Sequence, residues 1–413
     1  MHIDANNAYL SWTAVNMLEK GYHIDLRKVP SAVAGDPKSR HGIILTKSIP
    51  AKKLGIHTGE SLMEARQKCP ELIVLPSDYD LYLKCSEAMH DILSGYSDRI
   101  ERYSVDECWM DYTDSAPLFG DPIEVAYEIK ERIKKELGFT VNIGVSENKL
   151  LAKMASELKK PDMLHTLFPG EIEEKMWPLP VGDLFFVGRA TRVKLLRLNI
   201  RTIGELAKAD RTLLCSTLKP VHGTLVWKFA NGIDDSPVTP NGDVIRKGVG
   251  NSTTIPYDVY TEKEAYEVLL AISEMLGGRL RKLKCGGRTV SLTIRNSDLF
   301  WYRHQKKLVN AISTTTEIYE TAIMLFNECW RKEPVRQLGI HLSDLSESSC
   351  FQLSIFDRHD VENLRRIDDA VDNIRKRFGD GAIMRAAFAN TDLSPMLGGI
   401  NDGNYLMMGG YSL

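Results

Sequence analysis

Residues 103–112 read YSVDECWMDY, a stretch that places two adjacent carboxylates, Asp106 and Glu107, inside an apolar and β-prone run. A second short β-prone run opens the chain and leads into Asp4. An unpaired negative charge within a buried strand is costly unless a cation compensates it. We therefore interpret the three acids as candidate ligands of a divalent metal ion.

The spacing of these acids restricts how they can meet. Consecutive strand residues point to opposite faces, so Asp106 and Glu107 converge only at a turn or bulge, and a hairpin tip is predicted. Asp4 must then lie on a neighbouring strand of the same sheet. Hard oxygen ligands with room for water suit two Mg²⁺ ions, with Mn²⁺ as the alternative, which clamp the oxygens of a phosphoryl displacement. On spacing alone, such acids are more often a solvated turn and a chain end.

Length and composition exclude several classes of protein. A chain of 413 residues, 43% hydrophobic and 26% charged, predicts three or four units of an ordinary globular protein. No apolar run approaches the roughly 18 residues that span a bilayer, and no signal peptide precedes His2. The seven cysteines are scattered and never spaced as Cys-x-x-Cys, which argues against a disulfide framework and a zinc knuckle. We expect a cytoplasmic protein with no membrane contact.

Basic residues are concentrated in two segments although the net charge is only −2. Residues 186–232 contain nine Lys or Arg against two acids, and residues 279–307 contain nine against one. Two solvated helix faces would explain the same pattern. Two such segments in one near-neutral chain nevertheless favour two surfaces that grip a polyanion from two sides.

Hydrophobic periodicity predicts an α+β protein. Around the acids we expect two short strands within 100–112 and further elements as follows: a strand at 42–46, a helical stretch from Pro50, a helix at 61–69, a strand at 72–75, helices at 79–94 and 122–137, a strand at 140–145 and a helix at 148–158. A basic helical region follows at 183–230, and the breakers within 231–250 indicate a linker. The last part predicts a smaller α+β domain with helices near 262–284 and 313–331 and strands at 289–295 and 336–342.

Together these segments resemble the Y-family of translesion DNA polymerases, in particular the bacterial polymerase IV and polymerase V types. The resemblance rests on the Asp-x-Asn start at 4–6, on Ser104-x-Asp106-Glu107, and on the runs 141–161 and 179–206, and it covers nearly the whole chain. It implies a multidomain right-hand polymerase with these parts: a ferredoxin-like palm at 1–9 and 77–165, small fingers at 10–76, a helical helix-hairpin-helix thumb at 166–235, a linker at 236–250, an α+β little finger at 251–345 and a tail at 346–413.

The resemblance also implies roles for individual residues in a low-fidelity, DNA-templated reaction of the SOS response and DNA repair. A primer 3′-hydroxyl attacks the α-phosphate of a dNTP at metal ions held by Asp4, the main-chain carbonyl of Ala5, Asp106 and Glu107. Tyr9 falls at the steric gate that excludes a ribose 2′-hydroxyl, although an aromatic residue of the core would show the same sequence pattern. Nucleotide contacts fall on Asn6, Asn7, Ala8, Thr46, Lys52 and Lys160, whose hydroxyl and ammonium groups suit a triphosphate.

DNA and a processivity partner are implied as well. The thumb hairpin around Val187, Gly188, Arg189 and Thr191 would bind phosphates through main-chain amides without reading bases. Alternation along 289–295 predicts one buried face and one face toward the DNA backbone, with Arg288 and Arg295 among the DNA contacts. The peptide Gln352, Leu353, Ser354, Ile355 and Phe356 resembles the docking motif for the bacterial β sliding clamp, although an ordinary amphipathic strand would look alike. We expect a monomer.

Some departures from the family pattern support an alternative. Lys52 stands where many relatives carry Arg and cannot make its bidentate phosphate contact, so weaker nucleotide affinity is expected. Only three residues precede Asp4, which predicts a frayed first strand and a poorly anchored ligand. A catalytically weak, clamp-tethered DNA-binding factor is therefore the second hypothesis, and another palm-type two-metal enzyme such as a nucleotide cyclase is the third. Residues 358–413 suggest no role.

Overall fold

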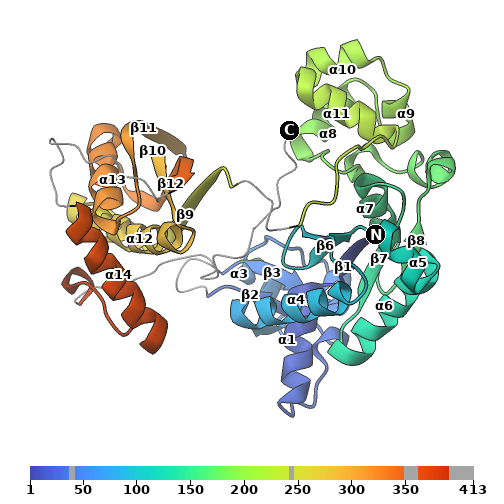
Figure 1. Ribbon diagram of the computed structural model, residues 1–413, viewed down its shortest axis with the longest axis horizontal. Coiled ribbons are helices and arrows are strands. Elements are labelled where there is room, and N and C mark those ends of the chain that lie inside the picture. The colour runs from blue at the N-terminus through green and yellow to red at the C-terminus, as the bar shows by residue number, and fades with distance from the viewer. Residues whose placement is uncertain (37–41, 241–245, 348–360, 390–413) are drawn as a thin grey trace. The chain divides into compact units, whose positions relative to one another are not determined.

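The computed structural model describes residues 1–36, 42–240, 246–347 and 361–389, and these form two compact units. The first unit comprises Met1–Gly35 and Ile44–Val244, and the main body of the second begins at Ile245 (Figure 1). Both units combine helices with sheets, as the α+β prediction requires. Within the described residues, no helix has the length and apolar character needed to cross a membrane.

The central sheet of the first unit has five strands in the order β5-β6-β1-β7-β8. Its strands are β1 (His2–Ala5), β5 (Ile100–Arg102), β6 (Glu107–Met110), β7 (Val141–Val145) and β8 (Leu164–Thr166). All pair antiparallel except β7 with β8. Helix α4 (Tyr79–Ser94) precedes β5, and α5 (Ala116–Phe119) and α6 (Pro122–Leu137) connect β6 to β7. This βαββαβ order is that of a ferredoxin-like fold, as predicted.

Strand β1 is the best-anchored part of this sheet. It pairs with β6 on one side and β7 on the other, and Ile3 lies opposite both Cys108 and Ile143. The side chains of these three residues are 1% exposed or less. The amino group of Met1 donates to the Met110 carbonyl at 2.8 Å. The expectation of a frayed first strand is therefore wrong, because pairing on both edges and burial fix β1 despite its position in the chain.

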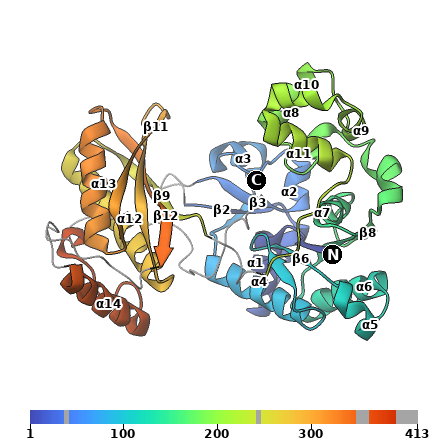
Figure 2. The same cartoon turned by 45° about the horizontal axis from the view of Figure 1, so that its top comes forward.

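Helix α7 (Lys149–Glu157) covers the face of the sheet on which the side chains of His2 and Asp4 lie. It approaches β7 so closely that a Cβ on Gly144 would lie 2.0 Å from the carbonyl oxygen of Ala152. Glycine is therefore required at this position. Helix α7 therefore lies beside β7 and β1 (Figure 2). Its Lys153 side chain reaches Glu107 of β6, which positions the candidate site.

A small sheet in the order β3-β2-β4 lies within residues 10–76, the range predicted as fingers. Its elements are β2 (Ser31–Ala34), β3 (Ile44–Lys47), α2 (Ile49–Lys53), α3 (Leu62–Lys68) and β4 (Ile73–Leu75). Helix α1 (Ala8–Glu19) crosses the boundary expected between residues 9 and 10. Leu10 and Ala14 of α1 share one core with Val33 of β2, which ties the small sheet to the helix that follows β1.

The helical region after the palm has four helices: α8 (Arg189–Arg197), α9 (Ile203–Ala207), α10 (Arg211–Leu218) and α11 (Pro220–Ala230). Their core includes Leu150, Leu151 and Met154, so α7 packs against this region as well as against the sheet. The segment after α11 is also fixed to the palm, since Asn148 donates to the carbonyl of Gly232 at 2.9 Å. One helix thus connects the expected palm and thumb.

The second unit contains an antiparallel sheet in the order β11-β10-β12-β9. It consists of β9 (Gly248–Val259), α12 (Glu262–Lys282), β10 (Cys285–Asn296), β11 (Trp301–Ile312), α13 (Thr315–Cys329) and β12 (Val335–Glu347). Both helices were predicted, and of the strands only β10 and β12 were. Strand β9 begins inside the expected linker 236–250, and β12 runs into the expected tail. Strand β11 was missed because half of its residues are polar and half are exposed, as in many edge strands.

Helix α14 (Val361–Phe378) belongs to the second unit, although the sequence assigned it to a tail without a role. Arg281 on α12 binds Asp368 at 2.9 Å, and Arg375 on α14 binds Glu274 at 2.9 Å. Phe388 buries its ring against the same face of α12. These buried ion pairs join residues far apart in the chain, which local sequence patterns do not reveal.

Candidate metal centre

Two of the predicted metal ligands lie directly opposite each other. Asp4 on β1 and Glu107 on β6 are Cα partners in the antiparallel ladder, and Asp4 is only 5% exposed. Strands β5 and β6 form the predicted hairpin, in which the amides of Tyr103 and Ser104 donate to the Glu107 carbonyl. The hairpin and the pairing with the strand of Asp4 are therefore confirmed.

Asp106 lies at the end of the hairpin turn, just before β6 begins. Its carbonyl accepts the amide of Ala5 at 2.9 Å, which places it beside the residue whose carbonyl was assigned to the same metal. Its carboxylate accepts the hydroxyl of Ser104 at 2.5 Å. Burial raises the pKa of Asp106, and the hydrogen bond from Ser104 partly offsets that effect. Asp106 is thus held at the site by Ser104 and Ala5.

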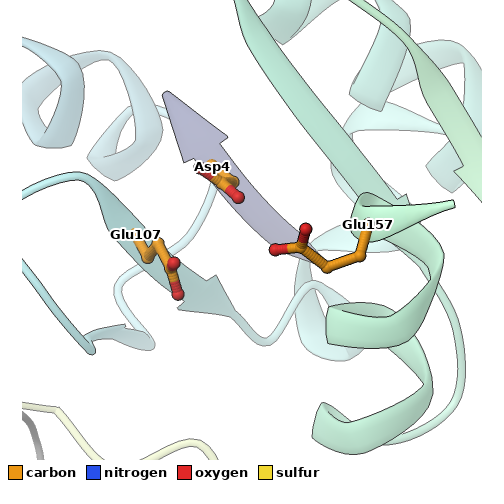
Figure 3. Close-up of side chains that lie close together, drawn as sticks. All are labelled: Asp4, Glu107 and Glu157. Atoms are coloured by element: carbon orange, nitrogen blue, oxygen red, sulfur yellow. The ribbon is translucent and has the colours of Figure 1, made fainter. Parts of the chain in front are cut away.

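A third acid that the sequence did not single out completes a cluster. Carboxylate oxygens of Asp4, Glu107 and Glu157 lie within 4.8 Å of one another, and Figure 3 shows them converging from β1, β6 and α7. Lys153 on α7 lies among them and donates to Glu107 at 2.8 Å. Spacing could have indicated these residues, because positions 149, 153 and 157 are four apart and share one face of a helix.

The surroundings set the charge of each group. Burial raises the pKa of Asp4, and the ammonium of Lys160 opposes this shift. Burial alone would also raise the pKa of Glu107, but the His2 ring, whose Nε2 lies 3.5 Å away, and the charge of Lys153 lower it to about 2. Burial lowers the pKa of His2 to about 4, so this ring is neutral at pH 7. Glu107 is therefore ionised and ready to bind a cation.

The donor set fits a divalent metal ion. The ligands are carboxylate and carbonyl oxygens, which Mg²⁺ and Mn²⁺ prefer over nitrogen or sulfur. Two lysine ammonium groups already lie against these oxygens, since Lys153 binds Glu107 and Lys160 binds Asp4. The protein therefore places its own ammonium groups where metal ions are expected to bind.

Comparisons with known proteins identify the family of the chain. Residues 3–157 match the model of the impB/mucB/samB family, and residues 246–355 match that family's C-terminal domain. The DNA polymerase IV of Clostridium acetobutylicum is 50% identical over 386 residues, which cover 93% of this chain and 96% of that protein. The chain belongs to the Y-family DNA polymerases. The DNA polymerase IV of Acetivibrio thermocellus is 40% identical, again over 93% of this chain and 96% of the relative.

Solved Y-family structures share the fold. The Y-family DNA polymerase chimera Dbh-Dpo4(243-245)-Dbh aligns with a TM-score of 0.74 at 22% identity, covering 84% of this chain and 98% of that one. An insertion ternary complex of Dbh DNA polymerase aligns with a TM-score of 0.59 at 22% identity, over 84% of this chain and 98% of that one. The multidomain α+β architecture expected for a Y-family polymerase is therefore confirmed.

Tyr9, the expected steric gate, lies in an aromatic cluster at the start of α1. Tyr9 occupies the first turn of α1 and is half-buried. Its ring stacks on Tyr82 with 4.6 Å between centroids, and the rings of Trp12 and Tyr79 contact its edges. These contacts limit the orientations of the Tyr9 side chain. A fixed ring is what a gate requires, because a mobile one would let a 2′-hydroxyl pass.

The predicted nucleotide contacts differ in their exposure and in the hydrogen bonds that they already make. Asn7 adopts a left-handed backbone and binds the Lys47 carbonyl at 2.8 Å and the hydroxyl of Thr46. Lys52 is exposed on α2 and Ala8 is buried. The side chain of Asn6 is bonded inward, since its oxygen accepts the amide of Asp162 at 2.8 Å. The Asn6 side chain thus supports the segment of Lys160, and its nucleotide contact stays a prediction.

The expected DNA contacts of the thumb lie at the start of α8. Val187 is buried, while Gly188 and Arg189 are exposed, and Gly188 is the N-cap residue of the helix. The hydroxyl of Thr191 lies 3.1 Å from Nε2 of His222. Leu195 is the buried residue of α8, whose exposed surface carries Arg189, Arg192, Lys194 and Arg197. Uncapped first-turn amides next to basic side chains suit a phosphate.

In the second unit, the predicted buried face of β10 is confirmed, because Val290, Leu292 and Ile294 are fully buried, but Ser291 on the opposite face is buried as well. Arg288 is exposed at an irregularity in the pairing with β11, and the guanidinium of Arg295 lies 5.0 Å from the ring centroid of Trp301. The clamp-like peptide at 352–356 lies outside the described residues.

Proposed function

We propose that this chain is a template-directed, low-fidelity translesion DNA polymerase that extends a primer 3′-end with dNTPs by two-metal phosphoryl transfer. The observation that carries the proposal is the pairing of Asp4 with Glu107 on buried neighbouring strands, with Asp106 at the adjoining turn. This geometry occurs in a chain that belongs to the Y-family over nearly its whole length. A DNA-binding factor without activity is not favoured, because DNA polymerase IV relatives match nearly the whole chain. The anchoring of β1 removes one of the observations that had suggested such a factor.

In this proposal Asp4, the carbonyl of Ala5, Asp106 and Glu107 hold the ions, and Mg²⁺ is preferred over Mn²⁺. When bound, the ions stabilise the charge that develops on the attacking and leaving oxygens. The chain itself positions the substrate: Lys160, Lys52 and Thr46 orient the triphosphate, and Tyr9 excludes the ribose 2′-hydroxyl. The segments 1–9 and 77–165 act as palm, 10–76 as fingers, 166–235 as thumb and 248–347 as little finger.

Primer extension tests the metal centre. Asp106→Asn keeps the shape of the side chain but removes its charge, so extension with Mg²⁺ and dNTPs should fall by at least about 10³-fold, the scale of losing a key electrostatic group. Asp114→Asn is the matched control, because Asp114 is 75% exposed and pairs only with Arg99 on the surface. Extension that persists in Asp106→Asn would refute this site.

Nucleotide selection tests the steric gate. Tyr9→Ala should reduce discrimination against rNTPs by roughly 10- to 100-fold, because a steric contact with one hydroxyl is lost. Tyr127→Ala is the control, since Tyr127 is 57% exposed on α6 and is not part of the aromatic cluster around Tyr9. Unchanged dNTP to rNTP ratios in Tyr9→Ala would reject the gate.

The proposed partners are primer-template DNA, dNTPs and the β sliding clamp, and the polymerase acts as a monomer in the SOS response. The described cysteines are all free thiols, which suits the reducing cytoplasm proposed as its compartment. If residues 352–356 dock on the clamp, the double variant Gln352→Ala, Leu353→Ala should lose clamp stimulation and keep clamp-free extension. Equal stimulation of both proteins would exclude this peptide as the docking site.

A further inference from the structure

Two ammonium groups lie between the three clustered carboxylates. Lys153 Nζ lies 2.8 Å from Glu107 Oε2 and 3.1 Å from Glu157 Oε1. Lys160 Nζ lies 2.9 Å from Glu157 Oε2 and also pairs with Asp4. Glu157 therefore binds one lysine with each of its two oxygens. Its position makes it a bridge between the ammonium groups that neutralise the two proposed metal ligands.

The two lysines differ in how easily their ammonium groups can separate from their acid partners. The Lys153 side chain is 10% exposed, and the Lys160 side chain is 35% exposed. A buried ammonium that loses its acid partners is strongly destabilised, whereas an exposed one is hydrated. Lys153 thus needs a remaining carboxylate whenever Glu107 binds something else. Glu157 is the acid in contact with Lys153 that the proposed metal centre does not use.

Metal ions and lysines compete for the same oxygens, since Asp4 and Glu107 serve both. We propose that Glu157 is a positioning residue that retains Lys153 and Lys160 when metal ions replace them at Glu107 and Asp4. This inference rests on the proposed metal centre. Glu157 lowers the cost of the exchange because it keeps the displaced ammonium groups paired next to the site.

If metal ions replace the lysines in this way, substitutions of Glu157 and of Lys153 should change the metal affinity in opposite directions. In Glu157→Gln both lysines keep only Glu107 and Asp4, so a metal ion must break those pairs without compensation. Metal affinity should then fall. In Lys153→Met the competing ammonium is absent, so metal affinity should rise. In the double variant, Glu157 no longer has Lys153 to retain, and most of its effect should disappear.

Mn²⁺ binding to the DNA-free protein, followed by the electron paramagnetic resonance signal of free Mn²⁺, measures this without catalysis. We expect a roughly tenfold weaker Kd for Glu157→Gln and a roughly threefold tighter one for Lys153→Met, the usual range of coupling between contacting residues. The double variant should bind within about threefold of Lys153→Met. A double variant as weak as Glu157→Gln would overturn the proposal, since Glu157 would then act as a ligand.

Control variants separate the possible failures. Glu136→Gln removes one charge from α6, where Glu136 pairs with Arg132 on the surface, and should leave the Kd unchanged. Glu157→Asp keeps the charge and should restore most of the affinity. If Asp106→Asn leaves Mn²⁺ binding intact, the proposed metal centre itself is wrong. If Asp106→Asn weakens binding but Glu157→Gln does not, only the role of Glu157 is wrong. Should Glu157→Gln not fold, an unchanged or weaker Kd in Lys153→Met would overturn the proposal.

Discussion

Helix α7 carries two buried lysines one turn apart whose surroundings differ. Lys149 Nζ lies 2.8 and 2.7 Å from the two oxygens of Glu101 and 4.5 Å from the ring centroid of Trp109. Glu101 also accepts the amide of Thr239 at 2.8 Å. Both side chains of this pair are 7% exposed or less. Lys153, in contrast, faces a cluster of acids of which Glu157 is 42% exposed.

The difference shows how one helix face serves structure and function. The Lys149–Glu101 pair is buried, and both of its members also bind the segment after α11, through the Pro237 carbonyl and the Thr239 amide. At Lys153 the three acids Asp4, Glu107 and Glu157 face two lysines, and His2 adds no charge at pH 7. The surplus of acidic groups over lysines and the opening to solvent suit a site for cations. A sealed pair stabilises the fold, and an open cluster with excess acid binds ligands.

The largest expected effect separates the two lysines by stability. Lys149→Met leaves the buried Glu101 carboxylate without its cationic partner and should lower the free energy of unfolding by about 3–5 kcal/mol. Lys153→Met should cost less, about 1–3 kcal/mol, because Glu157 is 42% exposed and Glu107 is 19% exposed, so solvent partly hydrates the acids that lose Lys153. Urea denaturation of both variants measures the difference. Equal losses would show that the two environments are not distinct.

A smaller effect follows from metal binding. Mg²⁺ at ten times its Kd should raise the free energy of unfolding of the wild type by about 1.4 kcal/mol, since it binds the folded state. Glu101→Gln should keep this increment although it is less stable, whereas Asp4→Asn should lose it. Thermal melting with and without Mg²⁺ provides the test. Loss of the increment in Glu101→Gln would mean that the sealed pair also controls the metal site.

The smallest effect concerns a third, more exposed contact of the palm. Asp162 binds Lys130 at 2.8 Å and Lys134 at 2.6 Å and is one quarter exposed. Burial alone would raise the pKa of Asp162, but the hydrogen bonds from the two lysines lower it overall. A carboxylate with a lowered pKa stabilises the fold at neutral pH, and this contribution is lost as the pH falls below 3.8.

Asp162→Asn should therefore cost about 0.5–1 kcal/mol at pH 7, the range for partly exposed ion pairs. The difference from the wild type should shrink in urea denaturation curves recorded at progressively lower pH below that value. If the difference stays constant over the same interval, the effect of Asp162→Asn comes from the hydrogen bonds of the side chain and not from its charge.

Local patterns predicted many elements of the first unit closely. Helices α4 and α6 have the predicted ends, because Asp78 and Asp121 cap their first turns and glycine follows each last turn. The β5–β6 hairpin and its pairing with the strand of Asp4 were also predicted. Strands β9 and β11 were not, because strands with one solvated face and few apolar residues give weak periodicity. The attachment of α14 through Arg281 and Arg375 had no local signal.

By itself, the sequence determined the family, the α+β pattern and the acids Asp4, Asp106 and Glu107 as the candidate centre. Only the tertiary structure decided that β1 lies at the centre of the sheet and that Asn6 supports the loop of Lys160. It also brought Glu157 and Lys153 to the same oxygens. The physical reason is that periodicity records which face of an element is buried, whereas Asp4 and Lys160 are 156 residues apart and meet only after packing. The close approach of α7 at Gly144 makes that packing possible.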